Sequence, residues 1–158
     1  MRLQLALNVS DLDASIEFYE KMFDTPVAKV KPGYANFAIE NPPLKLVLLE
    51  TGEAADATSL NHLGVEVEDA SQVTAAEERI REAGVETSGI DDTICCFAEK
   101  TETWVEGPGT KWEWYVKTAD AEGLENRIVS HTDTGGTANS ACCVGEEATT
   151  EAAEQNCC

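Results

Sequence analysis

Two stretches of the chain repeat one another and decide its fold: LQLALNVSD at residues 3–11 and NHLGVEVED at residues 61–69. Each stretch is an apolar run typical of a β-strand, ends in Val-x-Asp, and is followed by a segment with helical spacing of apolar residues. Asp is favoured at the start of a helix. Because an internal repeat is a stronger signal than a single motif, we expect two copies of one structural module.

Each copy continues with the pattern expected for the order β-α-β-β-β. In the first copy we predict a helix over residues 12–23 and strands over 27–31, 34–39 and 44–49. In the second copy we predict a helix over 70–83 and strands over 85–88, 94–99, 103–105 and 112–116. The predicted fold class is therefore α+β, with tandem βαβββ modules at about residues 1–50 and 60–118 that form a concave mixed sheet.

The C-terminal part of the chain differs in composition from the modules. Residues 119–158 contain eight acidic residues, one basic residue and no aromatic residue. Low hydrophobicity with high net charge predicts disorder, apart from a short helical turn within residues 124–129. We therefore predict a domain over residues 1–118 and an acidic, Cys-containing tail over 119–158, and we expect the tail to be dispensable for catalysis.

The charge and apolar content of the whole chain exclude several classes of partner. The 158 residues carry a net charge of −19, which disfavours binding to nucleic acid and to anionic membrane surfaces. No apolar run approaches the ~20 residues of a membrane span, and the N-terminus lacks the features of a signal peptide. We expect a cytoplasmic protein that is a monomer or, if modules pair between chains, a homodimer.

Three polar residues on predicted strands are candidates for a metal site. Gln4 and His62 occupy equivalent places in the repeat, each seven residues before the Asp, and Glu113 lies on the last strand of the second module. If the modules pair into one sheet, these side chains converge on its concave face. An imidazole, a carboxylate and an amide oxygen resemble the facial triad of non-haem Fe(II) oxygenases. The alternative is that each is a buried polar residue without a ligand.

The six cysteines occur as adjacent pairs: Cys95–Cys96, Cys142–Cys143 and Cys157–Cys158. Two neighbouring thiolates can bind one thiophilic atom. Adjacent side chains of a regular strand face opposite ways, so for shared binding we predict that residues 91–96 form a mobile loop or a strand end. The alternative for Cys95 and Cys96 is that they pack as two small buried apolar residues.

These motifs together resemble a known superfamily. NVSDLDASIEFYEKMF at residues 8–23, NHLGVEV at 61–67 and GPGTKWEWY at 107–115 resemble the vicinal oxygen chelate proteins, which include glyoxalase I, extradiol dioxygenases and bleomycin resistance proteins. KVKPGYANFAIENPPLKLVL at 29–48 and DDTICCFAEKTETWV at 91–105 resemble, more narrowly, the organoarsenical carbon–arsenic lyases and their cadmium-induced relatives.

The narrower resemblance implies a set of functional residues. It implies Fe(II) bound by Gln4, His62 and Glu113, with His62 and Glu113 as catalytic residues, although the superfamily usually has His where this chain has Gln4. It implies that Cys95 and Cys96 bind the substrate. The implied reaction is cleavage of the carbon–arsenic bond of a trivalent organoarsenical with O2, which releases arsenite.

Other functions are compatible with parts of the sequence. A non-catalytic protein that sequesters Cd(II) or As(III) would use the cysteine pairs alone. An extradiol-type dioxygenase would use the metal site and give no role to Cys95 and Cys96. A glyoxalase I would lack a ligand, because Val47 stands where the first module would need an equivalent of Glu113.

Overall fold

The computed structural model of the chain describes residues 1–51 and 59–132, which fold into two helices and nine strands. The first module contains β1 (Arg2–Val9), α1 (Leu12–Phe23), β2 (Lys29–Lys31), β3 (Tyr34–Ile39) and β4 (Leu44–Glu50). The second contains β5 (Ser59–Glu66), α2 (Ala70–Glu82), β6 (Ile90–Cys95), β7 (Ala98–Gly107) and β8 (Thr110–Asp120), and β9 (Arg127–Thr132) follows. The predicted α+β fold with two βαβββ modules is confirmed.

The strands of both modules belong to one mixed sheet with the order β2-β3-β4-β1-β5-β8-β7-β6-β9. Apart from β9 at one edge, the order is symmetric about the antiparallel pair β1 and β5, and each of these strands has a parallel neighbour, β4 or β8. Ala6 of β1 pairs with Val47 of β4, and Gly64 of β5 pairs with Glu113 of β8. The two modules therefore share one register, as the sequence repeat predicts.

The repeated Val-x-Asp motif starts both helices. The Asp11 carboxylate accepts a hydrogen bond from the Ala14 N–H at 2.8 Å, and the Asp69 carboxylate accepts one from the Gln72 N–H at 3.2 Å. Such caps satisfy N–H groups that have no partner inside the helix. The motif is thus a strand end joined to a helix cap, which explains why it marks both modules.

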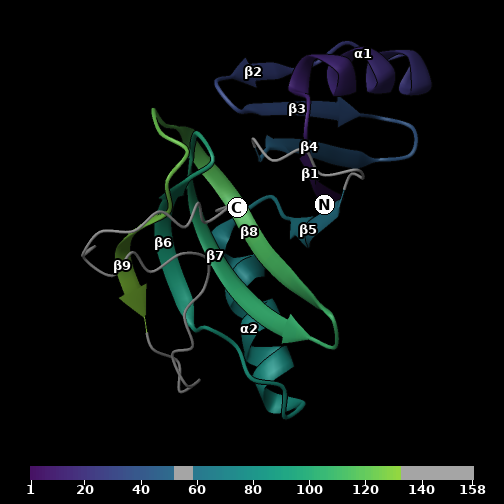
Figure 1. Cartoon of the computed structure of the whole chain (residues 1–158). Coiled ribbons are helices and arrows are strands. Elements are labelled where there is room, and N and C mark those ends of the chain that lie inside the picture. The colour runs from purple at the N-terminus through teal and green to yellow at the C-terminus, as the bar shows by residue number, and fades with distance from the viewer. Residues whose placement is uncertain (52–58, 133–158) are drawn as a thin grey trace.

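Each helix packs against the strands of its own module (Figure 1). Beneath α1 lies an apolar cluster that includes Phe37, Leu46 and Leu48, and in a second cluster Val73 of α2 packs with Val65 and Val116 of the sheet. A third cluster joins the modules and contains Ala6, Tyr34, Val47, Leu49 and Phe97. The third cluster places residue 97 of the second module against the first module.

The chain beyond residue 118 differs from the prediction. Strand β8 extends to Asp120, and β9 adds to the edge of the sheet by pairing antiparallel with β6. The helical turn predicted within residues 124–129 is therefore wrong. The β-branched residues Ile128 and Val129 favour a strand, and the average composition of residues 119–158 concealed this short segment. Residues 133–158, with Cys142, Cys143, Cys157 and Cys158, lie outside the described residues.

Two further predictions of strands need correction. The strand predicted over residues 85–88 does not form, and these residues have no regular secondary structure. The single strand predicted over residues 94–99 is also wrong, because the chain turns between β6 and β7 at Cys96 and Phe97. Neither described helix has both the length and the apolar character needed to cross a membrane.

Candidate functional site

The three polar residues of the predicted metal site lie side by side near the middle of the sheet. Gln4 is on β1, His62 on β5 and Glu113 on β8, which are consecutive strands, and Gly64 pairs with both Gln4 and Glu113. Gln4 Nε2 lies 3.0 Å from His62 Nε2 and 3.0 Å from Glu113 Oε2, and the latter two atoms are 3.5 Å apart. The structure thus brings all three side chains into one buried cluster.

Neighbouring side chains orient His62 and Gln4. His62 Nδ1 lies 2.7 Å from Asn61 Oδ1, which only accepts hydrogen bonds, so the proton is on Nδ1 and Nε2 presents its lone pair to the cluster. The Tyr115 hydroxyl donates to Gln4 Oε1 at 2.6 Å. Burial raises the pKa of Tyr115 well above its ordinary value, so this hydroxyl remains a donor at neutral pH.

Lys100 is a buried cation that faces two buried carboxyl groups. Its Nζ donates to Glu113 Oε1 and lies 2.8 Å from Glu102 Oε2. Burial raises the pKa of Glu102 to about 8 despite the attraction of Lys100, so Glu102 is far easier to protonate than an exposed carboxyl group. Burial opposes ionisation of Glu113 as well, but attraction to Lys100 outweighs it and holds the pKa of Glu113 well below its usual range. Lys100 therefore binds one oxygen of Glu113 and leaves Oε2 directed towards Gln4 and His62.

The candidate ligand atoms of the cluster fit a divalent cation. His62 Nε2 and Glu113 Oε2 both accept hydrogen bonds, and the amide nitrogen of Gln4 lies between them. Neighbouring ligand atoms around an octahedral cation with metal–ligand bonds of ~2.1 Å are ~3 Å apart. The distances of 3.0 Å from Gln4 Nε2 to His62 Nε2 and to Glu113 Oε2 are close to this spacing. Ligation by Gln4 Oε1 requires a half-turn of the amide, after which the Tyr115 hydroxyl accepts from Nε2.

The glutamine is needed for a three-ligand set. In the described part of the chain, no group of three or more His, Cys, Asp or Glu side chains is placed to hold a metal ion. His62 and Glu113 could supply two ligands, and the third would have to come from Gln4. A set of three protein ligands leaves other coordination positions open for exogenous groups.

Cys95 and Cys96 lie at a hairpin turn, so the mobile loop predicted for residues 91–96 is wrong and the alternative of a strand end is correct. Cys95 is the last residue of β6 and pairs with Ala98 at the start of β7. Cys96 and Phe97 form the turn between them with left-handed φ angles of 56° and 59°. Because the chain reverses here, the two sulfur atoms do not diverge as in a strand but lie 2.9 Å apart. Both residues are thiols, not a disulfide.

Segments distant in sequence hold this turn. The Cys96 N–H donates to the carbonyl of Leu124 at 3.2 Å, and the Phe97 N–H donates to the carbonyl of Gly123 at 2.7 Å. From the first module, Lys29 Nζ donates to the Phe97 carbonyl at 2.8 Å. A left-handed conformation costs a non-glycine residue about 1–3 kcal/mol, and these contacts offset that cost.

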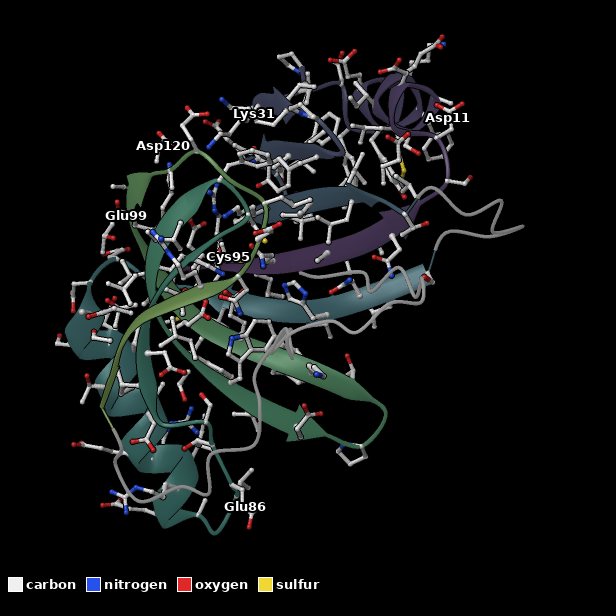
Figure 2. The ribbon with its side chains drawn as sticks, turned by 60° about the vertical axis from the view of Figure 1, so that its left-hand side comes forward. Asp11, Lys31, Glu86, Cys95, Glu99 and Asp120 are labelled. Carbon is white, nitrogen blue, oxygen red and sulfur yellow. The ribbon has the colours of Figure 1, made fainter. Side chains whose placement is uncertain are left out.

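The sulfur pair and the polar cluster line the same small cavity. Its volume is about 20 Å³, and its walls include Gln4, His62, Glu113, Cys95 and Cys96. This volume accommodates about one water molecule or one methyl group. The cavity adjoins a cleft of about 550 Å³, and Cys96 is part of the wall of both. Figure 2 shows Cys95 between the two modules, with Lys31 and Asp120 nearer the surface.

Sequence reasoning missed several polar residues of the site, among them Tyr115 and Lys100. Tyr115 shares a strand face with Glu113, and this period of two was a usable signal. Lys100 was not identifiable in this way, because its position near Glu113 depends on the register between β7 and β8. That register depends on the hairpin in which Gly107 pairs with Thr110, and the sequence does not fix the length of this turn.

Comparison with known proteins agrees with the fold and with the motifs. The sequence profile of the glyoxalase/bleomycin resistance protein/dioxygenase superfamily matches residues 3–96. The trivalent organoarsenical cleaving enzyme of Thermomonospora curvata is 58% identical over 124 residues, which are 78% of this chain and 82% of that protein. The cadmium-induced protein of Mycobacterium bovis is 49% identical over 148 residues, which are 93% of this chain and 95% of that protein. The resemblances stated from the sequence motifs are confirmed.

A solved structure supports the same assignment of the fold. The Mn(II)-bound glyoxalase of Novosphingobium aromaticivorans matches with a TM-score of 0.54 and 16% identity, over 77% of this chain and 41% of that chain. At this identity the likeness concerns the fold alone. Together with the profile match and the closely similar relatives, it shows that the chain belongs to the glyoxalase/bleomycin resistance protein/dioxygenase superfamily.

Proposed function

We propose that this protein is an Fe(II)- and O2-dependent enzyme that cleaves the carbon–arsenic bond of trivalent organoarsenicals and releases arsenite. One observation carries the proposal: two thiols 2.9 Å apart line the same cavity as a His, Glu and Gln cluster that fits a divalent cation. The names of relatives with 58% and 33% identity support it, because both are described as trivalent organoarsenical cleaving enzymes.

In this proposal Gln4, His62 and Glu113 hold Fe(II). When bound, Fe(II) supplies the activation of O2 that oxidative cleavage of a carbon–arsenic bond requires. Lys100 keeps the Glu113 carboxylate ionised and turned towards the other two ligands. Asn61 keeps the proton of His62 on Nδ1, away from the metal position.

Cys95 and Cys96 bind the arsenic atom. A trivalent methylarsenical carries two exchangeable hydroxyl groups. Each cysteine sulfur replaces one of them and the thiol proton leaves with the displaced hydroxyl, so that two S–As bonds form and two water molecules leave. The remaining substituent on arsenic is the carbon group, which the two sulfurs hold at a fixed place beside the polar cluster. Burial opposes the charge of Lys100, but attraction to Glu102 and Glu113, and less strongly to Cys95 and Cys96, raises the pKa of Lys100 well above its usual range, so a cation lies near both sulfur atoms.

The dimensions of the site favour a small carbon group. The cavity of about 20 Å³ admits a methyl group but not an aromatic ring without rearrangement of its walls. Methylarsonous acid is therefore the proposed substrate. A reducing compartment such as the cytoplasm would keep the cysteines as thiols.

The test is anaerobic reconstitution with Fe(II), followed by methylarsonous acid and then air, with arsenite measured by chromatography. We expect arsenite from the wild type and none from a Cys95→Ser/Cys96→Ser variant. A Cys142→Ser/Cys143→Ser variant is the matched control, because it makes the same change in another adjacent pair, and it should retain activity.

Three results would contradict the proposal. Arsenite formation that survives loss of Cys95 and Cys96 would remove the cysteines from the reaction. No arsenite from the wild type, together with tight binding of Cd(II) or As(III), would instead support a sequestering protein. Consumption of O2 with a catechol and none with an arsenical would support an extradiol-type dioxygenase.

A further inference from the structure

Five basic residues of this acidic chain line one cleft. The chain has eleven Lys and Arg residues and a net charge of −19. The residues that line the cleft of about 550 Å³ between the modules include Arg2, Lys29, Lys31, Lys45 and Lys117. A concentration of one sign of charge in a concave site raises the local concentration of ligands of the opposite sign.

The positive charge of the cleft is only partly neutralised. Three carboxylates of the cleft each contact one or two of the basic side chains, within 4 Å. The pairs are Glu66 with Arg2 and Lys45, Asp120 with Lys29 and Lys117, and Glu122 with Lys31. Five cations and three anions leave two positive charges in the lining. Lys45 and Lys29 have 13% and 23% exposed side chains, so solvent screens their charges less than those of surface lysines.

The cleft and the inner cavity differ in size and in position relative to the sulfur pair. Cys96 lines both spaces and Cys95 lines only the inner cavity, so the cysteine pair lies where the two spaces meet. The inner cavity faces the polar cluster and holds about 20 Å³, whereas the cleft faces solvent and holds about 550 Å³. The carbon group to be cleaved belongs in the inner cavity. The cleft therefore faces the other two substituents of arsenic, which leave when the cysteines bind.

We propose that the cleft binds an anionic carrier of the substrate: a low-molecular-weight thiol that bears carboxylate groups and is bonded to arsenic through its sulfur. This inference rests on the proposed function for the identity of the cargo. Methylarsonous acid alone is small and uncharged, and it would use neither the volume nor the positive charge of the cleft. A thiol adduct with carboxylates uses both.

Transfer of the arsenical from the carrier is an exchange of thiols. Each cysteine thiolate attacks arsenic and forms an S–As bond while one bond from arsenic to the carrier sulfur breaks. The carrier leaves as a thiolate and takes up the proton that the cysteine lost. Arsenic remains trivalent and keeps its carbon group, so neither an oxidant nor a reductant is consumed.

The test measures this transfer, not cleavage. The full chain with Cys142, Cys143, Cys157 and Cys158 changed to Ser is mixed anaerobically with methylarsenical adducts of mercaptosuccinate or of 2-mercaptoethanol. Arsenical bound to the remaining pair is followed by rapid quenching and mass spectrometry. We expect transfer at low salt to be about tenfold faster from the anionic carrier than from the neutral one, and the difference to vanish at high salt.

Charge-reversal variants link the effect to the cleft. In a Lys31→Glu/Lys117→Glu variant, transfer from mercaptosuccinate should slow about tenfold, and transfer from 2-mercaptoethanol should not change. A Lys21→Glu/Lys111→Glu variant is the matched control: it makes the same change of charge at two exposed lysines outside the lining, each paired with a surface Glu. It should behave as the parent protein with both carriers.

Three outcomes would overturn the inference. The first is equal transfer from both carriers at low salt, and the second is equal slowing of both carriers by the cleft variant. The third is a dependence on Lys31 and Lys117 that appears only when the carboxylate is on an aryl group bonded to arsenic, which would assign the cleft to the cleaved group. Arsenite release in a parallel aerobic assay tests the proposed function separately, because transfer is measured without O2.

Discussion

Residues 119–132 hold the thiol pair in place, and their removal should abolish high-affinity arsenical binding. Composition alone suggested a dispensable tail from residue 119. In the structure, backbone groups of Leu124 and Gly123 accept hydrogen bonds from Cys96 and Phe97, and the Ala121 N–H donates to the Phe97 carbonyl at 3.1 Å. The informative comparison is between truncated chains that end at residue 118 and at residue 132.

The magnitude follows from the hydrogen bonds that the shorter chain cannot form. Three backbone hydrogen bonds contribute roughly 3 kcal/mol at about 1 kcal/mol each. Against them stand two left-handed residues, Cys96 and Phe97, whose conformation costs about 1–3 kcal/mol each. A loss of roughly 3 kcal/mol reduces the population of the turn about a hundredfold, and the apparent affinity of a ligand that needs this turn falls by the same factor.

The assay is anaerobic titration with methylarsonous acid, and both chains suit it because neither contains the four tail cysteines. We expect the chain of residues 1–132 to bind as the full-length protein does at Cys95 and Cys96, and the chain of residues 1–118 to bind about a hundredfold more weakly. Binding of a divalent metal at Gln4, His62 and Glu113 serves as the control for folding and should change little. Equal arsenical affinity of the two chains, both folded, would refute the argument.

Three further predictions concern the polar cluster and β9. Gly64→Ala places a Cβ atom 3.3 Å from Gln4 Nε2 and should lower the affinity for a divalent metal about tenfold in calorimetric titration. Glu113→Gln removes one of the two buried carboxyl groups that pair with Lys100 and should lower the free energy of unfolding by about 3–5 kcal/mol in urea, whereas the exposed Glu99→Gln should not. Hydrogen bonds from Thr101 and Ser130 lower the pKa of Asp92 below its unfolded value of 3.8. Its contribution to stability is therefore complete above pH 3.8 and is lost as the pH falls through the lower folded pKa, and Asp92→Asn should remove this loss in acid denaturation curves.

The fold was largely predictable because the sequence contains two copies of the same module. The helix predicted over residues 12–23 matches α1, and the strand predicted over 34–39 matches β3. In both segments the apolar residues recur regularly, and residues that favour turns or helix caps flank them. Where prediction failed, the segments were short: residues 85–88 and β9 depend on tertiary partners more than on their own composition.

The site was predictable in its members but not in its geometry. Repeat symmetry pointed to Gln4 and His62, because equivalent strands of paired modules meet at the symmetry axis. The arrangement of Cys95 and Cys96 was not accessible in this way, because a hairpin turn with two left-handed, non-glycine residues has no sequence signature. It exists because residues 121–124 and Lys29 contact it, and these are distant in sequence.

The symmetry of the fold also explains why one site forms and not two. Val47 occupies in the first module the register position that Glu113 occupies in the second, opposite Ala6 and Gly64 respectively. Val47 packs in the cluster that receives Phe97, so the first module supplies the apolar support of the thiol turn. An acid at residue 47 would place a charge within that support. The two modules therefore have different roles in the site. The first module packs against the thiol turn, and the second supplies Glu113. Gln4 of the first module completes the polar cluster by its contact with Glu113.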